Sequence, residues 1–239
     1  MLNWVRCLVL FLALLPAGLA SADDYAAATE ATRKGDYAAA FKLLKPLAEK
    51  GDARAQTELA AMYMIGKGAP RDPREAIKWT KLAAERGNAA AQYNLGTMYL
   101  EGQLVARDYK EAMKWSLLAA GQGVAAAQMN VASMYYEGAG VQQDYGEAAK
   151  WVRLAAAQGD PEAQLNLGTM YAQGQGVAQD FLRGYMWTHL AIEQPALGMT
   201  ESEKKSVHDL SAKTLSAEEL PKAEAMAKKC RESKFKDCD

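Results

Sequence analysis

The sequence predicts an all-α protein, a right-handed superhelical solenoid of helix-turn-helix repeats. The first observation is the dipeptide Ala-Gln, which begins at positions 55, 91, 127 and 163 and so recurs every 36 residues. The second is that several other columns keep the same interval, which is the signature of a repeat architecture. One helix pair cannot bury its apolar face alone, so the pairs are expected to stack. The other columns are Leu59, Leu95, Val131 and Leu167; Tyr63, Tyr99, Tyr135 and Tyr171; Gly66, Gly102, Gly138 and Gly174; Asp72, Asp108, Asp144 and Asp180; and Trp79, Trp115, Trp151 and Trp187.

Each repeat is expected to contain two helices. Apolar residues spaced i, i+4, i+7 and i+8 over residues 91–99 share one face of a helix. Residues 112–119 follow the same rule with the spacing i, i+3, i+6 and i+7. The glycine-rich segment between these two stretches is therefore predicted to be the turn.

Capping residues mark the expected helix boundaries. An Asp followed three residues later by Glu is typical of an N-cap and its capping box, and a Gly after the second helix suits a left-handed C-terminal residue. Val124 cannot cap with its side chain, and Arg183 replaces the Glu expected after Asp180. The Asp-Glu pairs are Asp72 and Glu75, Asp108 and Glu111, and Asp144 and Glu147; the glycines are Gly51, Gly87, Gly123 and Gly159; Asp52, Asn88 and Asp160 are expected to cap the first helix of the next repeat.

Residues 1–22 have the order of a secretory signal peptide. A single charge, Arg6, precedes an apolar run and a small-residue stretch that ends at Ala22. The run is shorter than the roughly 20 residues that span a bilayer, so an uncleaved membrane anchor is the weaker alternative. No small-residue box precedes Cys7, and we expect no lipid anchor. The sequence thus predicts a periplasmic or secreted protein with no stable membrane anchor after cleavage.

The rest of the chain divides into three parts. Residues 23–51 form a partial N-terminal repeat, residues 52–194 four full repeats, and residues 195–239 a helical cap. Pro46 interrupts the partial repeat and predicts a kink or a short helix, because an interior proline removes a backbone hydrogen bond. Two capping boxes predict two helices in the cap, one beginning with Thr200 to Glu203 and one with Ser216 to Glu219.

Two cysteines, Cys230 and Cys238, follow the repeats. Disulfides persist in exported proteins, so we expect these two to be bonded and to close a short loop, with free thiols as the alternative. Their spacing is not that of a CxxC redox motif. Such a bond would be structural.

Composition and motifs argue against several functions. The chain has 28 Lys and Arg against 29 Asp and Glu, so it lacks the basic footprint of a nucleic-acid-binding protein. His189 and His208 are not in a metal-binding spacing and are interpreted as ordinary helix residues. The Gly-x-Gly pieces lie between predicted helices and lack the context of a phosphate loop. We predict no catalytic residues, no cofactor and no metal.

The repeat unit resembles the Sel-one-like repeat, a relative of the tetratricopeptide repeat. Residues 91–99 read Ala-Gln-Tyr-Asn-Leu-Gly-Thr-Met-Tyr, and residues 108–112 read Asp-Tyr-Lys-Glu-Ala. The resemblance covers about residues 24–194 and implies an adaptor or scaffold that binds a protein or peptide. A cysteine-rich secreted branch of the family is linked to β-lactam binding or hydrolysis, but this chain has no cysteine within its repeats. A cell-wall or β-lactam hydrolase and a polysaccharide-binding protein remain alternatives.

The resemblance also suggests where a partner binds. In tetratricopeptide relatives the first helix of each repeat lines a concave groove, where an Asn can hold an extended peptide. The alternative is that each Asn bonds the neighbouring repeat as part of the framework. A carboxylate clamp is not predicted, because no cation lies one turn before these Asn residues. The candidates are Asn94, Asn130 and Asn166, then Thr97, Ser133 and Thr169, and the variable positions Tyr93, Met129, Tyr136 and Leu165.

Overall fold

The structure is a computed structural model that describes residues 17–238, with side chains from residue 23 onward. Residues 1–16 of the predicted signal peptide lie outside the described residues, so this segment stays a prediction. The described part holds twelve α-helices, one short 3-10 helix and no strand, which confirms the all-α fold class. Within it, no helix combines the length and the apolar character that crossing a membrane requires.

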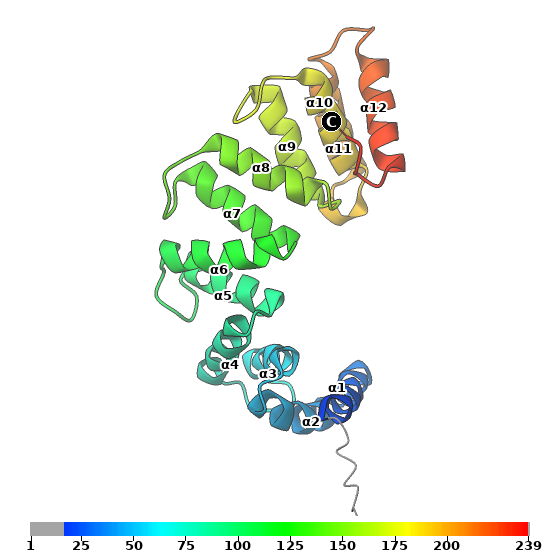
Figure 1. Cartoon of the computed structure of the whole chain (residues 1–239). Helices are drawn as coiled ribbons and strands as arrows, with labels where there is room; N and C mark the ends of the chain where they lie inside the picture. The colour runs from blue at the N-terminus through cyan, green and yellow to red at the C-terminus, as the bar shows by residue number, and fades with distance from the viewer. Residues whose placement is uncertain (1–16, 239) are drawn as a thin grey trace, which may run out of the picture. The chain divides into compact units, whose positions relative to one another are not determined.

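The helices form two compact units, and the boundary between them follows Trp79. Consecutive helices pack as pairs within each unit (Figure 1), α1 against α2 in the first and α5 against α6, α7 against α8 and α9 against α10 in the second. The bounds are α1 Ala17–Arg33, α2 Tyr37–Glu49, α3 Ala53–Ile65, α4 Pro73–Glu85, α5 Ala89–Glu101, α6 Tyr109–Gly121, α7 Ala125–Glu137, α8 Tyr145–Ala156, α9 Pro161–Gln173, α10 Phe181–Ile192, α11 Glu201–Ala212 and α12 Leu220–Glu232, with the 3-10 helix at Pro195–Leu197.

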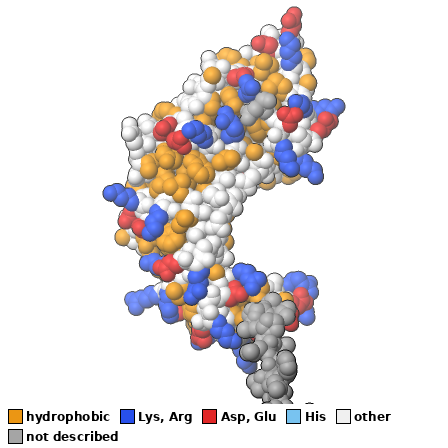
Figure 2. All heavy atoms as spheres, viewed as in Figure 1, with side chains coloured by type: hydrophobic (Ala, Val, Ile, Leu, Met, Phe, Trp, Pro, Cys, Tyr) orange, Lys and Arg blue, Asp and Glu red, His pale blue; other side chains and the backbone are white. Residues whose placement is uncertain are grey.

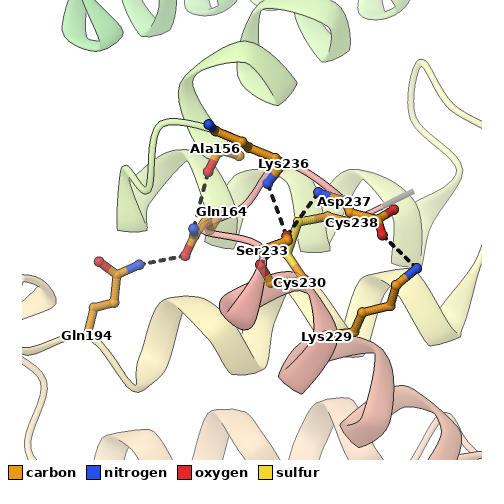
Figure 3. The surroundings of a disulfide bond; sticks show 9 residues. All are labelled: Ala156, Gln164, Gln194, Lys229, Cys230, Ser233, Lys236, Asp237 and Cys238. Carbon is orange, nitrogen blue, oxygen red and sulfur yellow. Dashed lines mark hydrogen bonds and ion pairs between the residues drawn. A yellow bond between two sulfur atoms is a disulfide. The ribbon is translucent and has the colours of Figure 1, made fainter.

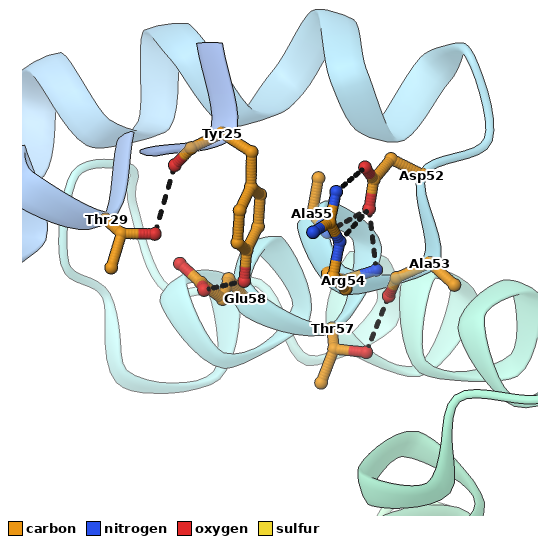
Figure 4. Close-up of polar contacts among 8 residues, drawn as sticks. All are labelled: Tyr25, Thr29, Asp52, Ala53, Arg54, Ala55, Thr57 and Glu58. Carbon is orange, nitrogen blue, oxygen red and sulfur yellow. Dashed lines mark hydrogen bonds and ion pairs between the residues drawn. The ribbon is translucent and has the colours of Figure 1, made fainter. Parts of the chain in front are cut away.

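In the first unit, polar contacts at the start of α3 join it to α1 (Figure 4). The hydroxyl of Tyr25 on α1 donates to Oε1 of Glu58, and the Arg54 guanidinium lies 4.3 Å from the centroid of the Tyr25 ring. Burial and the neighbouring Glu58 raise the pKa of Tyr25 to about 12. Asp52 caps α3 by accepting from the Arg54 N–H at 2.9 Å, as predicted.

Pro46 does not shorten its helix. α2 extends over 13 residues and includes Pro46 in its interior, so the expected short helix is not formed. The proline deprives the Lys42 carbonyl of its usual partner, but Lys42 and Pro46 are both exposed. Water can therefore satisfy that carbonyl, and burial of the opposite face of α2 keeps the helix intact.

The predicted aspartate caps are confirmed, but the Glu of the expected capping box has another role. Asp108 Oδ1 accepts from the Glu111 N–H at 3.1 Å. The Asp108 N–H donates to the Tyr99 carbonyl at 3.0 Å, so it is not available to the Glu111 side chain. Instead, Glu111 Oε2 accepts from Trp115 Nε1 at 2.9 Å. The same arrangement joins Asp72, Tyr63, Glu75 and Trp79.

Helix α7 begins without a side-chain cap, as the sequence predicted. Val124 has φ −72° and ψ 107°, close to the values of the capping residues Asn88 and Asp160. Threonine has the shape of valine, so its methyl group can keep the packing of Val124 while its hydroxyl accepts a backbone N–H. We expect Val124→Thr to raise the free energy of unfolding by about 0.5–1 kcal/mol, measured by urea denaturation. Val124→Ala is the control and should lower that free energy.

A row of buried glutamines joins the pairs of the second unit. Gln128 Nε2 donates to the Ala120 carbonyl at 3.3 Å, and Gln128 Oε1 accepts from Gln158 Nε2 at 2.8 Å. The same two bonds recur one repeat later around Gln164, which accepts from Gln194 at 2.7 Å. The glutamine of the Ala-Gln dipeptide is therefore a structural link between successive helix pairs.

The two predicted cap helices are present and pack against α10. Thr200 and Glu203 form the predicted capping box at the start of α11. Ser216 and Glu219 also exchange backbone-to-side-chain bonds, of 2.8 and 3.3 Å, but α12 begins only at Leu220. Pro221 explains the late start, since a residue without an N–H fits the first turn of a helix.

Cys230 and Cys238 are joined by a disulfide, as predicted, and it closes the loop after α12 (Figure 3). Cys230 is fully buried in the core cluster that contains Trp187 and Leu190. Within the loop, Ser233 Oγ accepts from two backbone N–H groups, of Lys236 and of Asp237. The tail is thereby held against the last repeat.

Candidate binding pocket

A pocket of about 380 Å³ lies between α7, α8 and α9 of the second unit. It brings together five of the predicted partner-binding residues, which come from two consecutive repeats. Its floor is apolar, and amide side chains lie at its rim. The predicted members are Met129, Ser133, Tyr136, Asn166 and Thr169; the others are Ala132, Ala148, Val152, Met170, Gln173 and Gln175.

Helix periodicity positions these side chains. Met129, Ser133 and Tyr136 are spaced i, i+4 and i+7 on α7, which places them on one face. Asn166 and Thr169 share a face of α9 by the spacing i and i+3. The small side chains of the floor leave room above the buried core, and this is why a hollow forms between the two repeats.

Tyr136 borders the pocket and is held by two neighbours. Its side chain is 41% exposed, its ring meets that of Tyr145 edge to face with centroids 5.0 Å apart, and its hydroxyl donates to Gln175 Oε1 at 3.3 Å. On the face that Figure 2 draws, apolar side chains gather over α6 and α7, with charged side chains at their margins. The ring therefore offers contact area at a fixed position.

The pocket lining carries no Asp, Glu, Lys, Arg or His. Its polar groups are amides and hydroxyls, which both donate and accept hydrogen bonds. The described residues also contain no group of three or more His, Cys, Asp or Glu placed to hold a metal ion. Such a lining suits an uncharged ligand with an apolar group and several hydrogen-bonding atoms.

The remaining predicted residues lie elsewhere. Asn130 Nδ2 donates to Thr97 Oγ1 at 3.1 Å. This bond joins α7 to α5, so Asn130 has the framework role that was the alternative to binding a partner. Tyr93 is half-buried against the core cluster that includes Val131, and Asn94 is exposed on α5. Leu165 lines a separate hollow beside α11. These positions do not line the pocket.

Sequence reasoning missed the amides of Gln173 and Gln175 and the floor residues Ala148 and Val152 of α8. Gln175 lies between two glycines, in the segment that the sequence predicts to be a turn. The α8 residues belong to a second helix, which the tetratricopeptide resemblance did not place at a groove. Only the packing of α8 beside α9 brings these side chains to the pocket.

The structure also brings the two histidines together, on α10 and α11. Their ring centroids are 5.9 Å apart, and Tyr185 Oη lies 2.9 Å from His208 Nε2. His189 Nε2 lies 3.3 Å from Glu193 Oε1, whereas its buried Nδ1 has no hydrogen-bond partner among the described residues. Burial lowers the pKa of His189; the charges of His208 and Arg231 lower it further, and Glu193 opposes them.

This lowered pKa makes stability depend on pH. Below the usual pKa of 6.5, His189 in the unfolded chain binds a proton that the folded state resists, so acid favours unfolding. We expect the free energy of unfolding to fall as the pH drops from about 7 to about 5, and His189→Phe to reduce this slope while keeping a ring against Tyr185. Urea denaturation across this range tests it. An unchanged slope in the variant would assign the effect to other groups.

The geometry of the helices identifies the chain as a helical-repeat solenoid with a pocket between successive repeats. Its sequence matches the family model described as Sel1 repeat over residues 30–52, 53–88, 89–124, 125–160 and 161–195. The chain belongs to the Sel1 repeat family. Sel1 repeats in general mediate protein-protein interactions.

Two solved structures are similar to the chain. A Sel1 repeat protein from Oxalobacter formigenes shares 35% identity with a TM-score of 0.63, over 73% of this chain and 49% of that one. A protective antigen of uropathogenic Escherichia coli strains, which displays an SLR fold, shares 25% identity with a TM-score of 0.56, over 90% and 55%. The chain thus spans about half the length of each. No curated protein matches it.

Proposed function

We propose that the chain is an exported, non-catalytic scaffold that binds an extended segment of a protein partner in the pocket between α7, α8 and α9. The observation that carries this proposal is the pocket itself, which combines an apolar floor with an uncharged polar rim across two repeats. Membership of the Sel1 repeat family supports an interaction role.

Binding would use two kinds of contact. An apolar side chain of the partner enters between Met129 and Met170, whose flexible thioethers adapt to its shape. The backbone of the partner pairs with the amide side chains of Asn166 and Gln173, which can both donate and accept. Because no lining side chain is charged, affinity should change little with salt concentration.

Export is proposed from the order of residues 1–22 and agrees with the presence of a disulfide, a bond that persists in oxidising compartments. N-terminal sequencing of the protein recovered from a cell envelope or culture medium tests it. A chain that begins just after Ala22 supports export, and a chain that retains residues 1–22 contradicts cleavage.

Capture from an envelope extract with mild crosslinking tests the binding proposal. The test variant carries Met129→Ala, Tyr136→Ala and Asn166→Ala, and we expect it to lose the captured protein. The matched control carries Leu117→Ala and Leu118→Ala, which remove exposed apolar surface from α6 outside the pocket. Equal capture by both variants and the unmodified protein would place the partner site elsewhere.

The same lining chemistry favours one second candidate, a neutral oligosaccharide. Amide side chains and an exposed Tyr ring are groups that pair with sugar hydroxyls and pack on sugar rings. Competition of soluble neutral glycans against protein capture separates the two candidates. The hydrolase alternative is tested with β-lactam and muropeptide substrates, and turnover abolished by one substitution would overturn the non-catalytic proposal.

A further inference from the structure

The loop that the disulfide closes, residues 230–238, has a single apolar side chain between its two cysteines, that of Phe235. This ring packs against the core cluster that contains Trp187. It also lies against Gly159 in the turn between α8 and α9, where a built Cβ would be 3.0 Å from Phe235 Cε2. Phe235 therefore anchors the loop to the last repeat.

The loop covers an apolar surface of that repeat. Phe235 lines a hollow of about 260 Å³ together with Leu154, Ala157 and Trp187. Leu154 lies on α8, Ala157 directly follows α8, and Trp187 lies on α10. Trp187 is only 1% exposed. Departure of the Phe235 ring would therefore open this hollow and uncover its apolar lining.

Two consecutive residues of the loop have a strained backbone. Lys234 has φ +55° and Phe235 has φ +63°. This left-handed conformation is unfavourable for residues with a side chain, because Cβ comes too close to the following carbonyl oxygen. The Phe235 N–H donates to the Cys230 carbonyl at 2.9 Å, so the left-handed pair forms the turn that ends α12. Other interactions of the loop have to offset this strain.

Most of the polar contacts that hold the loop are exposed or lie within it. Lys229 Nζ and Asp237 Oδ2 are 2.7 Å apart, but their side chains are 69% and 57% exposed, and such an ion pair contributes little. Ser233 Oγ accepts from two N–H groups of the loop itself. The disulfide restricts the conformations open to these residues, and it thereby favours the strained turn over relaxed alternatives.

One sulfur of the bond is open to attack. Cys230 is fully buried, whereas Cys238 is partly exposed and lines the hollow beside Phe235. A thiolate of a dithiol can attack Cys238 Sγ, which breaks the bond to Cys230 and forms a mixed disulfide. The second thiolate of the dithiol then displaces Cys238. The dithiol becomes a disulfide, the protein bond gains two electrons, and the two protons of the dithiol pass to the cysteine sulfurs.

We propose that residues 233–238 form a reducible strap, and that a dithiol which opens the Cys230–Cys238 bond relaxes the strained turn and releases Phe235 from Gly159 and Trp187. Reduction thus uncovers the apolar hollow while the helices stay folded. The hollow shares no lining residue with the pocket between α7, α8 and α9, so the strap does not depend on the function proposed for that pocket.

Two resonances in ¹H–¹⁵N spectra of the full chain test the strap, the amide of Gly159 and the indole N–H of Trp187. Spectra are recorded before and after reduction with dithiothreitol, and a mass gain of two hydrogens confirms that the bond has opened. Oxidised Phe235→Ala is the reference for a lost ring. We expect reduction to move both resonances toward their positions in this variant and to leave the amides of α7 unchanged.

The variant Lys234→Gly tests the role of strain. Glycine adopts a positive φ readily, and the variant keeps both cysteines and the Phe235 ring. After reduction we expect it to favour the docked strap roughly five- to thirtyfold more than the reduced unmodified chain does, so both resonances move back toward their oxidised positions. Lys236→Gly is the matched control, because position 236 has no positive φ and glycine relieves no strain there.

Three results would overturn the proposal. In the first, the Gly159 and Trp187 resonances stay unchanged in the reduced protein. In the second, the amides of α7 and α9 lose their folded positions together with these two resonances, which would make the bond a constraint on the whole unit. In the third, reduced Lys234→Gly and reduced Lys236→Gly behave alike, which would show that strain does not drive release.

Discussion

Replacing Gly176 by alanine is expected to lower the free energy of unfolding by about 3 kcal/mol or more. Gly176 has φ +70°, and a Cβ built there would lie 1.9 Å from the carbonyl oxygen of Tyr145, in the preceding helix pair. That oxygen belongs to the backbone of α8 and cannot rotate away. The left-handed conformation and the clash therefore add, and the turn has to move away from α8.

Two other glycines separate these contributions. Gly123 has φ +88° with no atom within 4 Å of a built Cβ, so Gly123→Ala should show the conformational cost alone, about 1 kcal/mol. Gly121 ends α6 without a positive φ and also has open space, so Gly121→Ala should be neutral or stabilising. Urea denaturation of the three variants measures all effects. If Gly176→Ala and Gly123→Ala lose the same stability, the close approach to Tyr145 is not rigid.

The second large effect is expected at the glutamine row. Gln164 is fully buried, donates to the Ala156 carbonyl at 3.2 Å and accepts from Gln194. Gln164→Ala leaves a cavity and removes both bonds, so we expect a loss of about 2–3 kcal/mol in the free energy of unfolding. Gln194→Ala should cost about 1–2 kcal/mol, because it leaves the Gln164 oxygen buried without its partner.

A double-mutant cycle checks whether the side chains of Gln164 and Gln194 are energetically coupled. In the double variant no buried amide oxygen remains unsatisfied, so its loss should be smaller than the sum of the single losses by about 1 kcal/mol. Additive losses would show that the Gln164–Gln194 bond contributes no coupling. Gln128 and Gln158 form the equivalent bond one repeat earlier, with 2.8 Å between their amides. The same cycle on this pair should give the same result.

Most of the fold could be predicted from the sequence, because it depends on interactions between residues close together in the chain. The Asp and Asn caps, the left-handed glycines and the pairing of Cys230 with Cys238 were all predictable, because each depends on residues close together in the chain. The role of Glu111 was not, because the N–H expected to bind it is taken by the Tyr99 carbonyl. The short helix expected at Pro46 is not formed either, since the effect of a proline depends on whether the carbonyl it frees faces water.

The candidate pocket likewise has features that the sequence predicts and features that it does not. Met129, Ser133 and Tyr136 share a helix face by periodicity alone, and the sequence therefore placed them together. Asn130 has the same residue type and repeat position as Asn166, yet it bonds Thr97 whereas Asn166 lines the pocket. A repeated column cannot distinguish these two roles, because the difference arises from the side chains that the preceding helix pair presents.

The sequence by itself determined the class of fold, the repeat length, most of the helix boundaries and the paired cysteines, because periodicity, caps and turn glycines act over a few residues. Only the tertiary structure decided which side chains meet. It joined Gln164 to Gln194, placed Tyr136 beside α9, brought His189 against His208 and set Arg153 and Arg183 around Tyr171. These contacts depend on how successive helix pairs stack, and stacking depends on packing between residues distant in the chain.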